Sequence, residues 1–280
     1  MIDAHVHLIT RSIFREALRD WGVEEEKLAA RLADMPDVSA DELRAPWLEA
    51  MDANGIEKAV FVSFSPGCEE FLRFVNSSER FAGLTSLNPT KEGSLERLQR
   101  DIERGMSGLK LYPSGRGFSV ADERIYPLYE YCQEKGIPIL IHFGITIGPV
   151  SDLRYGNPID LSPVLSRFTT LPFILAHFGA GFFREALMLT YKRENVYFDS
   201  SGTNNWLCYH PHGLNLVDVF KQTLGLVGPE RLLFGTDSRI RPDGYRVEML
   251  KQQRSILNLL LEPPEVELAM GENARRLYHL

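Results

Sequence analysis

The sequence predicts a single-domain (β/α)8 TIM barrel, and three observations support this prediction. The chain has 280 residues, which suits one barrel of roughly 250 residues with short insertions. Eight short runs rich in aliphatic and β-branched residues recur along it. Most of the segments between these runs have the apolar spacing of an amphipathic helix. The expected domain covers residues 1–280, with an extended loop after the first strand.

The strands and helices of this barrel can be placed one by one. Strands are expected at residues 2–8, 58–64, 81–87, 108–112, 138–144, 173–179, 196–202 and 231–238. Consecutive apolar residues, as at 139–141, are typical of parallel strands that are buried on both faces. Helices are expected at residues 47–54, 95–103, 126–135 and 182–192. Gly55 and Gly136 precede the next strand and fit left-handed helix C-caps.

The segment after the first strand is longer than a minimal barrel needs. Residues 11–45 separate that strand from the next helix, and they include a charged helical stretch at 24–33 followed by Met35, Pro36 and Asp37. A connection that follows a barrel strand emerges at the catalytic face, so this segment is placed to act as a lid. A plain surface insertion is the alternative, and the sequence does not decide between them.

Composition and charge exclude several classes of protein. Hydrophobic residues make up 44% of the chain and charged residues 25%, the balance of a globular protein with a sizeable core. The net charge is −7 and basic residues are scattered, which disfavours nucleic-acid binding. Neither a membrane-spanning run nor a secretory signal is recognisable, and the three cysteines lack the spacing of a disulfide or thiolate site. We expect a cytoplasmic protein that binds neither nucleic acid nor membranes.

Five side chains that commonly bind metals lie at the ends of predicted strands. His5 and His7 are two residues apart in the first strand, so both imidazoles point in the same direction. His142 ends the fifth strand, His177 the sixth and Asp237 the eighth, on the face where barrel enzymes place their active sites. A carboxylate buried among neutral imidazoles is costly without a cation. The pattern predicts a metal site, although the His5/His7 motif alone also fits two core histidines.

These motifs together resemble the amidohydrolase superfamily, specifically the branch containing aminocarboxymuconate semialdehyde decarboxylase and related decarboxylases and hydrolases. The resemblance spans nearly the whole chain. It rests on IDAHVH, MDANGIEKAVF, GLKLYP, IHFG, AHFG, VYFDSSG, FGTDS and the closing GENARRLY. The combination is specific for the superfamily and much less so for any one reaction.

The resemblance implies a single divalent metal, most often Zn²⁺, with Mn, Fe or Co as alternatives. The implied ligands are His5, His7, His142 and Asp237, with a water completing the shell. Such a metal lowers the pKa of its water toward ~7. His177 is then expected to hydrogen-bond the water or polarise the substrate, and Asp237 to carry a proton from the water to the leaving group.

Two residues of the fourth strand have alternative interpretations. Lys110 lies where binuclear relatives carry a carboxylated lysine that bridges two metals. The favoured interpretation here is a charged amine that neutralises the site or meets an anionic substrate. Tyr112 shares the inward face with Lys110, and relatives often have histidine at this place. A role in lining the substrate pocket is favoured for Tyr112 over hydrogen bonding or acid catalysis.

Arginines that follow strands are candidates for binding a substrate carboxylate. They are Arg116, Arg154, Arg239 and Arg241. Arg239 is favoured because it lies two residues after Asp237, and a solvated loop position is the alternative for each.

Further polar and aromatic residues are expected to play lesser parts. His210 and His212 suggest a second metal, but surface histidines are favoured. Asp3 and Asp199 are expected to support the ligands from behind. The sequence does not fix the oligomeric state. Relatives commonly self-associate, and Trp206 with its apolar neighbours is a candidate for lining a contact between subunits.

The leading functional expectation is a metal-dependent hydrolase that acts on an amide, ester or lactone bond of a small, carboxylate-bearing molecule. A non-oxidative decarboxylase of an unsaturated or aromatic acid uses the same residues and is the alternative. A third hypothesis, an inactive barrel that serves as a binding module, is disfavoured because all the expected ligands are present.

Overall fold

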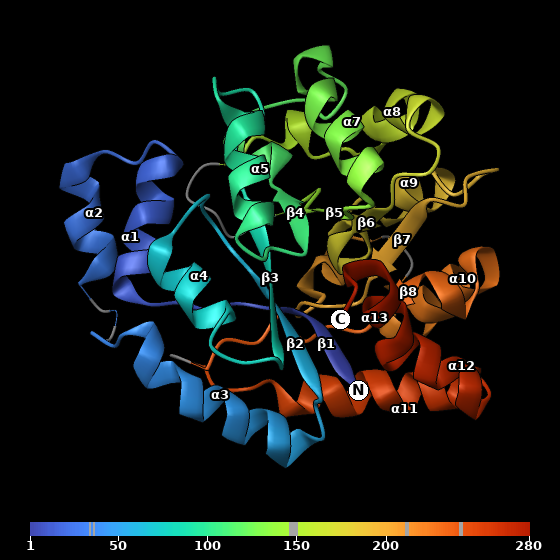
Figure 1. Ribbon diagram of the computed structural model, residues 1–280. Helices are drawn as coiled ribbons and strands as arrows, with labels where there is room; N and C mark the ends of the chain where they lie inside the picture. Colours follow the sequence, from blue (N-terminus) through green and yellow to red (C-terminus); the bar gives the residue numbers. More distant parts are fainter. Residues whose placement is uncertain (34, 36, 146–150, 211–212, 241–242) are drawn as a thin grey trace.

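The computed structural model describes residues 1–33, 35, 37–145, 151–210, 213–240 and 243–280. Eight parallel strands form one sheet in the order β1-β2-β3-β4-β5-β6-β7-β8, and helices surround it (Figure 1). The first and last strands meet, because the backbone N–H of His7 donates to Ser238 O at 2.9 Å and that of Asp237 donates to His5 O at 2.8 Å. The predicted (β/α)8 TIM barrel is confirmed.

All eight predicted strands are present, and each ends earlier than the apolar run that predicted it. The strands are β1 Ile2–Val6, β2 Lys58–Val62, β3 Phe81–Ser86, β4 Gly108–Leu111, β5 Ile139–Ile141, β6 Phe173–Leu175, β7 Val196–Asp199 and β8 Leu232–Leu233. The chain leaves the sheet in these runs because residues near their ends adopt turn conformations. His177 and Phe178, for example, both have φ of 54°. The side chains predicted to form the site therefore belong to the loops that begin where the strands end.

The helices fill the connections between strands. They are α1 Arg11–Asp20, α2 Glu25–Leu32, α3 Ala40–Asn54, α4 Glu69–Val75, α5 Ser94–Glu103, α6 Pro113–Arg116, α7 Tyr126–Lys135, α8 Ser162–Arg167, α9 Phe183–Met188, α10 Leu216–Val227, α11 Val247–Leu260, α12 Pro263–Glu267 and α13 Asn273–Tyr278. Short helical turns add η1 Glu123–Ile125, η2 Leu153–Tyr155, η3 Pro158–Leu161, η4 Ala176–Gly179, η5 Asn205–Tyr209, η7 Pro229–Arg231 and η8 Leu268–Glu272.

Two of the predicted helices differ from the structure in length. α3 begins well before residue 47, because Ser39 and Glu42 form a reciprocal capping box at its N-terminus. α9 covers only part of the predicted residues 182–192. The left-handed C-caps predicted at Gly55 and Gly136 are confirmed, with φ of 65° and 67°.

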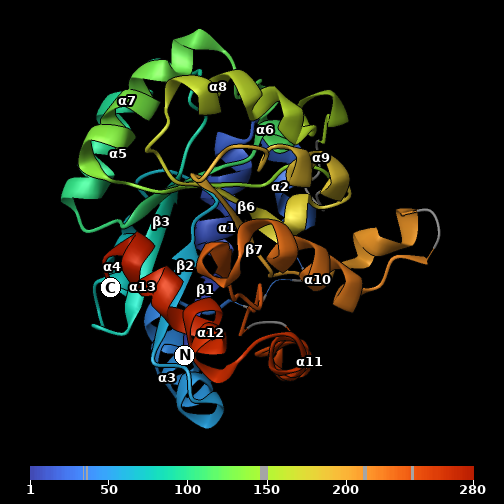
Figure 2. The same ribbon diagram turned by 90° about the vertical axis from the view of Figure 1, so that its right-hand side faces the viewer.

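Alternation along the strands divides the apolar side chains between two layers. In β2, Val60 and Val62 belong to the cluster inside the barrel, whereas Ala59 and Phe61 belong to the larger cluster between the sheet and the helices. The two termini lie close together near α12 and α13 (Figure 2). Among the described residues, none of the helices combines the length and hydrophobicity that a membrane crossing requires.

The long segment after β1 folds into two helices of its own. α1 and α2 stand as a pair beside the barrel (Figure 1), and they share a small apolar cluster of Leu18, Leu28 and Leu32. At the end of α1, Trp21 Nε1 donates to Phe64 O at 3.0 Å. This bond ties the segment to the loop that follows β2, at the same end of the barrel as the predicted site.

Candidate active site

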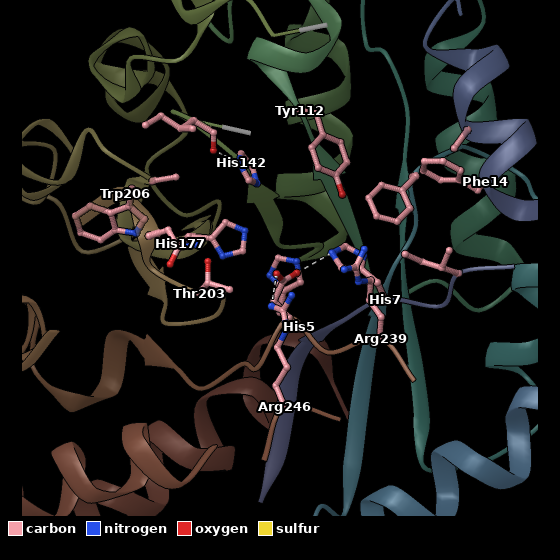
Figure 3. A pocket seen from close by; sticks show the side chains of 18 of the residues that line it. His5, His7, Phe14, Tyr112, His142, His177, Thr203, Trp206, Arg239 and Arg246 are labelled. Carbon is pink, nitrogen blue, oxygen red and sulfur yellow. Dashed lines mark hydrogen bonds and ion pairs between the residues drawn. The ribbon is translucent and has the colours of Figure 1, made fainter. Parts of the chain in front are cut away.

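A cavity of about 470 Å³ lies at the ends of the strands. All five predicted metal-competent side chains line it, namely His5, His7, His142, His177 and Asp237. Figure 3 shows the imidazoles turned toward this space, with Tyr112 above them and Arg246 below. The barrel therefore brings together, at one cavity, five groups that are distant in sequence.

The two histidines of the first strand region each have one ring nitrogen anchored. His5 Nδ1 lies 2.5 Å from Asp199 Oδ2, and His7 Nδ1 lies 3.0 Å from Val62 O. A carbonyl or carboxylate oxygen can only accept, so Nδ1 carries the proton in both rings. The Nε2 atoms of His5 and His7 are thus left with free lone pairs, as metal ligation requires.

Asp237 is held from two sides. Its Oδ1 lies 3.1 Å from His7 Nε2, and its Oδ2 accepts a hydrogen bond from the Arg246 guanidinium at 2.8 Å. Its φ of 57° is in the left-handed region, which aspartate tolerates better than most residues.

The donor set at this point fits one divalent cation. One ligand atom each from His5, His7 and Asp237 lies within 4.8 Å of the others. Two imidazole nitrogens and a carboxylate oxygen suit Zn²⁺ and its first-row neighbours. His5, His177 and Asp199 also form a compact group, but it shares His5, whose Nδ1 already bonds Asp199. That second group is therefore a hydrogen-bond network behind the first.

The two remaining histidines lie beside each other. His177 Nδ1 donates to Ser201 O at 2.9 Å, which leaves Nε2 free, and its ring stacks on His5 at 5.1 Å. Burial lowers the pKa of His177 to about 4. The ring of His142 is 4.8 Å from that of His177, and its Nε2 lies 3.0 Å from Ile145 O. His142 is thus near, but not within, the compact group, and its role as fourth ligand stays a prediction.

A serine that the sequence reasoning missed joins these histidines. Ser201 Oγ lies 3.0 Å from His5 Nδ1 and 2.9 Å from His177 Nδ1, and it donates to Asp199 Oδ2 at 2.8 Å. Asp199 itself bonds His5, in line with the supporting role expected for it. The available signal was the spacing of two residues between Asp199 and Ser201, since side chains two apart in a strand share a face.

Lys110 and Tyr112 lie next to each other, but only Tyr112 lines the cavity. Lys110 is fully buried, its Nζ lies 4.9 Å from the centre of the Tyr112 ring, and it has no hydrogen-bond partner among the described residues. Burial lowers its pKa to about 7. The predicted pocket-lining position of Tyr112 agrees with the structure, whereas direct contact of Lys110 with a substrate would need the cavity to extend beneath Tyr112.

The predicted arginines have different environments. Arg239 lines the cavity and pairs with Asp243. Arg154 is 83% exposed and binds Asp152 at 2.5 Å, and it is not among the described residues that line the cavity. The structure therefore corrects its assignment as a substrate contact, because a nearby carboxylate holds its guanidinium at the surface. Arg241 lies outside the described residues.

Arg116 has a structural environment instead of a substrate-binding one. Its guanidinium is 1% exposed and lies 2.8 Å from Asp20, and it donates to Phe64 O at 2.6 Å. Arg31 and Arg246, which sequence reasoning missed, line the cavity together with Arg239. No spacing rule identifies them, because they are separated along the sequence from the nearest strand. Arg31 lies in α2, and Arg246 directly precedes α11.

Trp206 lies at the cavity, and a subunit contact there stays a prediction. It is 6% exposed and lines the cavity, and its Nε1 donates to Asn204 Oδ1 at 3.0 Å. It is therefore a wall of the site. His210 lies 5.3 Å from the Trp206 ring and belongs to neither metal-competent group, whereas His212 lies outside the described residues.

The segment after β1 forms the opposite wall. Phe14, Ala17 and Leu18 of α1 line the cavity, as does Trp21, which follows α1 directly. Figure 3 shows Phe14 facing the cavity across from Trp206. This placement over the site is what a lid requires, and a surface insertion without contact to the site is excluded for α1.

The sequence profile described as "Amidohydrolase" matches residues 2–280. The chain belongs to the amidohydrolase family. Members of this superfamily are metal-dependent enzymes and include hydrolases, hydratases and decarboxylases. The family assignment agrees with the histidines and aspartate gathered at the cavity.

Two kinds of curated relative are similar to this amidohydrolase. A dihydroorotase from Aliivibrio fischeri is 26% identical over 184 residues, which are 62% of this chain and 48% of the relative. The chain therefore spans about half the length of the dihydroorotases that it matches. A 2-keto-4-carboxy-3-hexenedioate hydratase from a Sphingobium strain is 22% identical over 85% of this chain and 82% of the relative.

Solved structures show the same fold. A TIM-barrel protein from Bordetella bronchiseptica matches with a TM-score of 0.70 and 24% identity, over 100% of this chain and 98% of that one. The 5-carboxyvanillate decarboxylase of Sphingomonas paucimobilis matches with a TM-score of 0.64 and 16% identity, over 100% and 99% of the two chains. An amidohydrolase from Burkholderia multivorans, with a TM-score of 0.66, 16% identity and coverage of 100% and 99%, has bound zinc.

Proposed function

We propose that this amidohydrolase is a metal-dependent hydrolase of a small, carboxylate-bearing molecule, with an amide, ester or lactone bond as its target. One observation supports this most directly. The free Nε2 atom of His177 belongs to a ring that stacks on His5 at 5.1 Å, next to the group formed by His5, His7 and Asp237. A proton acceptor thus stands beside a cation site, as activation of water requires.

The proposed ligands are His5, His7, His142 and Asp237, with Zn²⁺ as the favoured ion. When bound there, the ion supplies a Lewis acid and lowers the pKa of a bound water. His177 is neutral at neutral pH, because burial lowers its pKa to about 4, so it can orient the water as an acceptor. Asp237 is assigned the transfer of a proton to the leaving group.

The residues that line the cavity favour a flat, acidic substrate. Aromatic side chains line it from several elements, namely Phe14, Trp21, Phe64, Tyr112 and Trp206. Arg239 and Arg246 contribute guanidinium groups at the same cavity, and such groups match a carboxylate. Lys110 is buried next to Tyr112. We therefore assign it no direct contact with the substrate, only an electrostatic effect on the site. A lactone or cyclic amide with a carboxylate would satisfy both features.

Decarboxylation of an unsaturated or aromatic acid is the second candidate. The aromatic walls accommodate such a substrate as well as a lactone, and the proton-transfer residues are the same. The two reactions differ in product and not in the residues that they need, so assays of product formation separate them.

The test is a substrate screen with protein loaded with Zn²⁺. Lactones, cyclic amides and esters that bear carboxylates are compared with hydroxybenzoates and muconate-like acids, with acid release and CO2 release measured in parallel. We expect acid release from the first set without CO2. CO2 release from the second set alone would establish a decarboxylase, and binding without turnover across both sets would support the binding-module hypothesis. Asp237→Asn is the control and should be inactive.

A further inference from the structure

Two consecutive residues ahead of α11 contact β1 and the residues that follow β8. Tyr245 and Arg246, together called the 245–246 segment, contact residues on both sides of Asp237. Neither residue was identified by the sequence pattern, and only Arg246 lines the cavity.

Tyr245 is connected to both strands through a buried carboxylate. Its hydroxyl donates to Asp3 Oδ2 at 2.8 Å, and Asp3 is 0% exposed. Asp3 Oδ1 accepts from the backbone N–H groups of His5 at 3.3 Å and of Thr236 at 3.0 Å. Thr236 Oγ1 donates to Asp3 Oδ2 at 2.6 Å. Asp3 therefore links the residue that precedes Asp237 to the backbone of His5.

Arg246 contacts Asp237 and the residue that follows it. Its guanidinium donates to Asp237 Oδ2 at 2.8 Å, and its backbone N–H donates to Ser238 Oγ at 2.9 Å. The guanidinium also donates to Thr236 O at 3.4 Å. The 245–246 segment thus contacts Thr236, Asp237 and Ser238 directly, and it reaches Thr236 through Asp3 as well. These contacts surround Asp237, whose φ of 57° is in the left-handed backbone region. Few residues other than glycine adopt this conformation unless their neighbours hold them in it.

We propose that Tyr245 and Arg246 are positioning residues that aim Asp237 Oδ1 at the cation site. A hydrogen bond between a guanidinium and a carboxylate is short and directional. With Oδ2 bonded to Arg246, the other oxygen is fixed toward His7 Nε2, 3.1 Å away. Partners of this kind commonly set the affinity of a metal site without contacting the ion. The inference rests on the metal site of the proposed function, but it does not depend on which reaction that site performs.

The test measures metal affinity and needs no substrate. Zn²⁺ affinity is determined by competition with a chromophoric chelator, and the ligand geometry is followed through the visible absorption of bound Co²⁺. Arg246→Met should weaken Zn²⁺ binding by about 10- to 100-fold, and Arg246→Lys should recover part of the loss because it restores a donor to Oδ2. Tyr245→Phe should weaken binding by a smaller factor and should alter the Co²⁺ spectrum in the same direction.

Arg239→Met is the matched control. Arg239 belongs to the same loop and lines the same cavity, but its partner is Asp243. Its loss should leave Zn²⁺ affinity within about twofold of the parent. Circular dichroism of each metal-free variant establishes that it folds. If Arg246→Met does not fold, Arg246→Lys and Tyr245→Phe provide the test.

The outcomes separate this inference from the proposed function. A parent protein that binds no Zn²⁺ would overturn the metal site and the proposed function with it. A parent that binds Zn²⁺, with affinities for Arg246→Met, Arg246→Lys and Tyr245→Phe all within about twofold of it, would overturn only the positioning role. Equal loss of affinity in Arg239→Met would also contradict it, because the effect would then come from cavity charge.

Discussion

Nε2 of His7 lies 3.1 Å from Oδ1 of Asp237, although the two residues come from the first and last strand regions of the barrel. The backbones on either side of this contact are joined by the bonds that close the barrel, from His7 N to Ser238 O and from Asp237 N to His5 O. The cation site therefore forms only when the barrel closes, and metal binding is expected to stabilise the fold.

Replacement of His177 is expected to lower kcat, whereas replacement of His142 is expected to lower Zn²⁺ affinity. His177→Asn should lower kcat by about 10²- to 10⁴-fold, as expected for the loss of a general acid or base, while Zn²⁺ remains bound. His142→Asn, the matched variant, should lose Zn²⁺ affinity if it is the fourth ligand. Metal analysis and kcat on both proteins check the assignment. Loss of Zn²⁺ from His177→Asn with retention by His142→Asn would exchange the two roles.

Replacement of Arg239 by Met should raise KM for a carboxylate substrate and change kcat much less. The reason is that Arg239 lines the cavity, while its guanidinium pairs with Asp243. Arg154→Met is the matched control, since its guanidinium is 83% exposed and paired with Asp152. Steady-state kinetics on the two variants test this. The same KM in Arg239→Met and in the parent would remove Arg239 from the substrate site.

Arg116→Met should destabilise the protein by about 3–5 kcal/mol, the usual result of removing one partner from a buried ion pair. The guanidinium is 1% exposed and lies 2.8 Å from Asp20 at the end of α1. Urea denaturation measures the free energy of unfolding. Arg104→Met, which removes an exposed pair with Glu69, should unfold at nearly the parent's urea concentration. Equal midpoints for both variants would show that Arg116 does not anchor α1.

Lys110 should make stability depend on pH above neutrality. Burial lowers its pKa from 10.5 to about 7, so between these values the unfolded chain binds a proton that the folded chain does not. The free energy of unfolding contributed by this group therefore rises with pH across that window and is lowest below it. Urea denaturation at a series of pH values should show this rise in the parent and a flatter profile in Lys110→Met. Parallel profiles would contradict a buried, titrating amine.

Most of the fold could be predicted because strand and helix patterns are local properties of the sequence. Runs such as residues 139–141 have apolar side chains on both faces, and this alone indicates a buried parallel strand. The strand ends could not be placed, because turns such as that at His177, with φ of 54°, depend on packing around the site.

Site residues at the ends of strands could be predicted from the sequence. Site residues whose position depends on a hydrogen-bond or ion-pair partner could not. His5 and Asp237 occupy positions that the barrel geometry brings to one face. Arg154 follows a strand in the same way, but Asp152 holds it at the surface. Arg246 reaches the site from the start of α11 because Asp237 accepts its hydrogen bond. Which carboxylate pairs with which guanidinium is a property of the folded chain and not of the local sequence.

The metal requirement tests the central claim most directly. Protein is purified, its metal content is measured, and all metal is removed with a chelator before Zn²⁺ is returned, with turnover of a substrate found in the screen measured at each step. The account predicts about one ion per chain, loss of turnover on removal and recovery on return, with no recovery in Asp237→Asn. Full turnover by rigorously metal-free protein would contradict it.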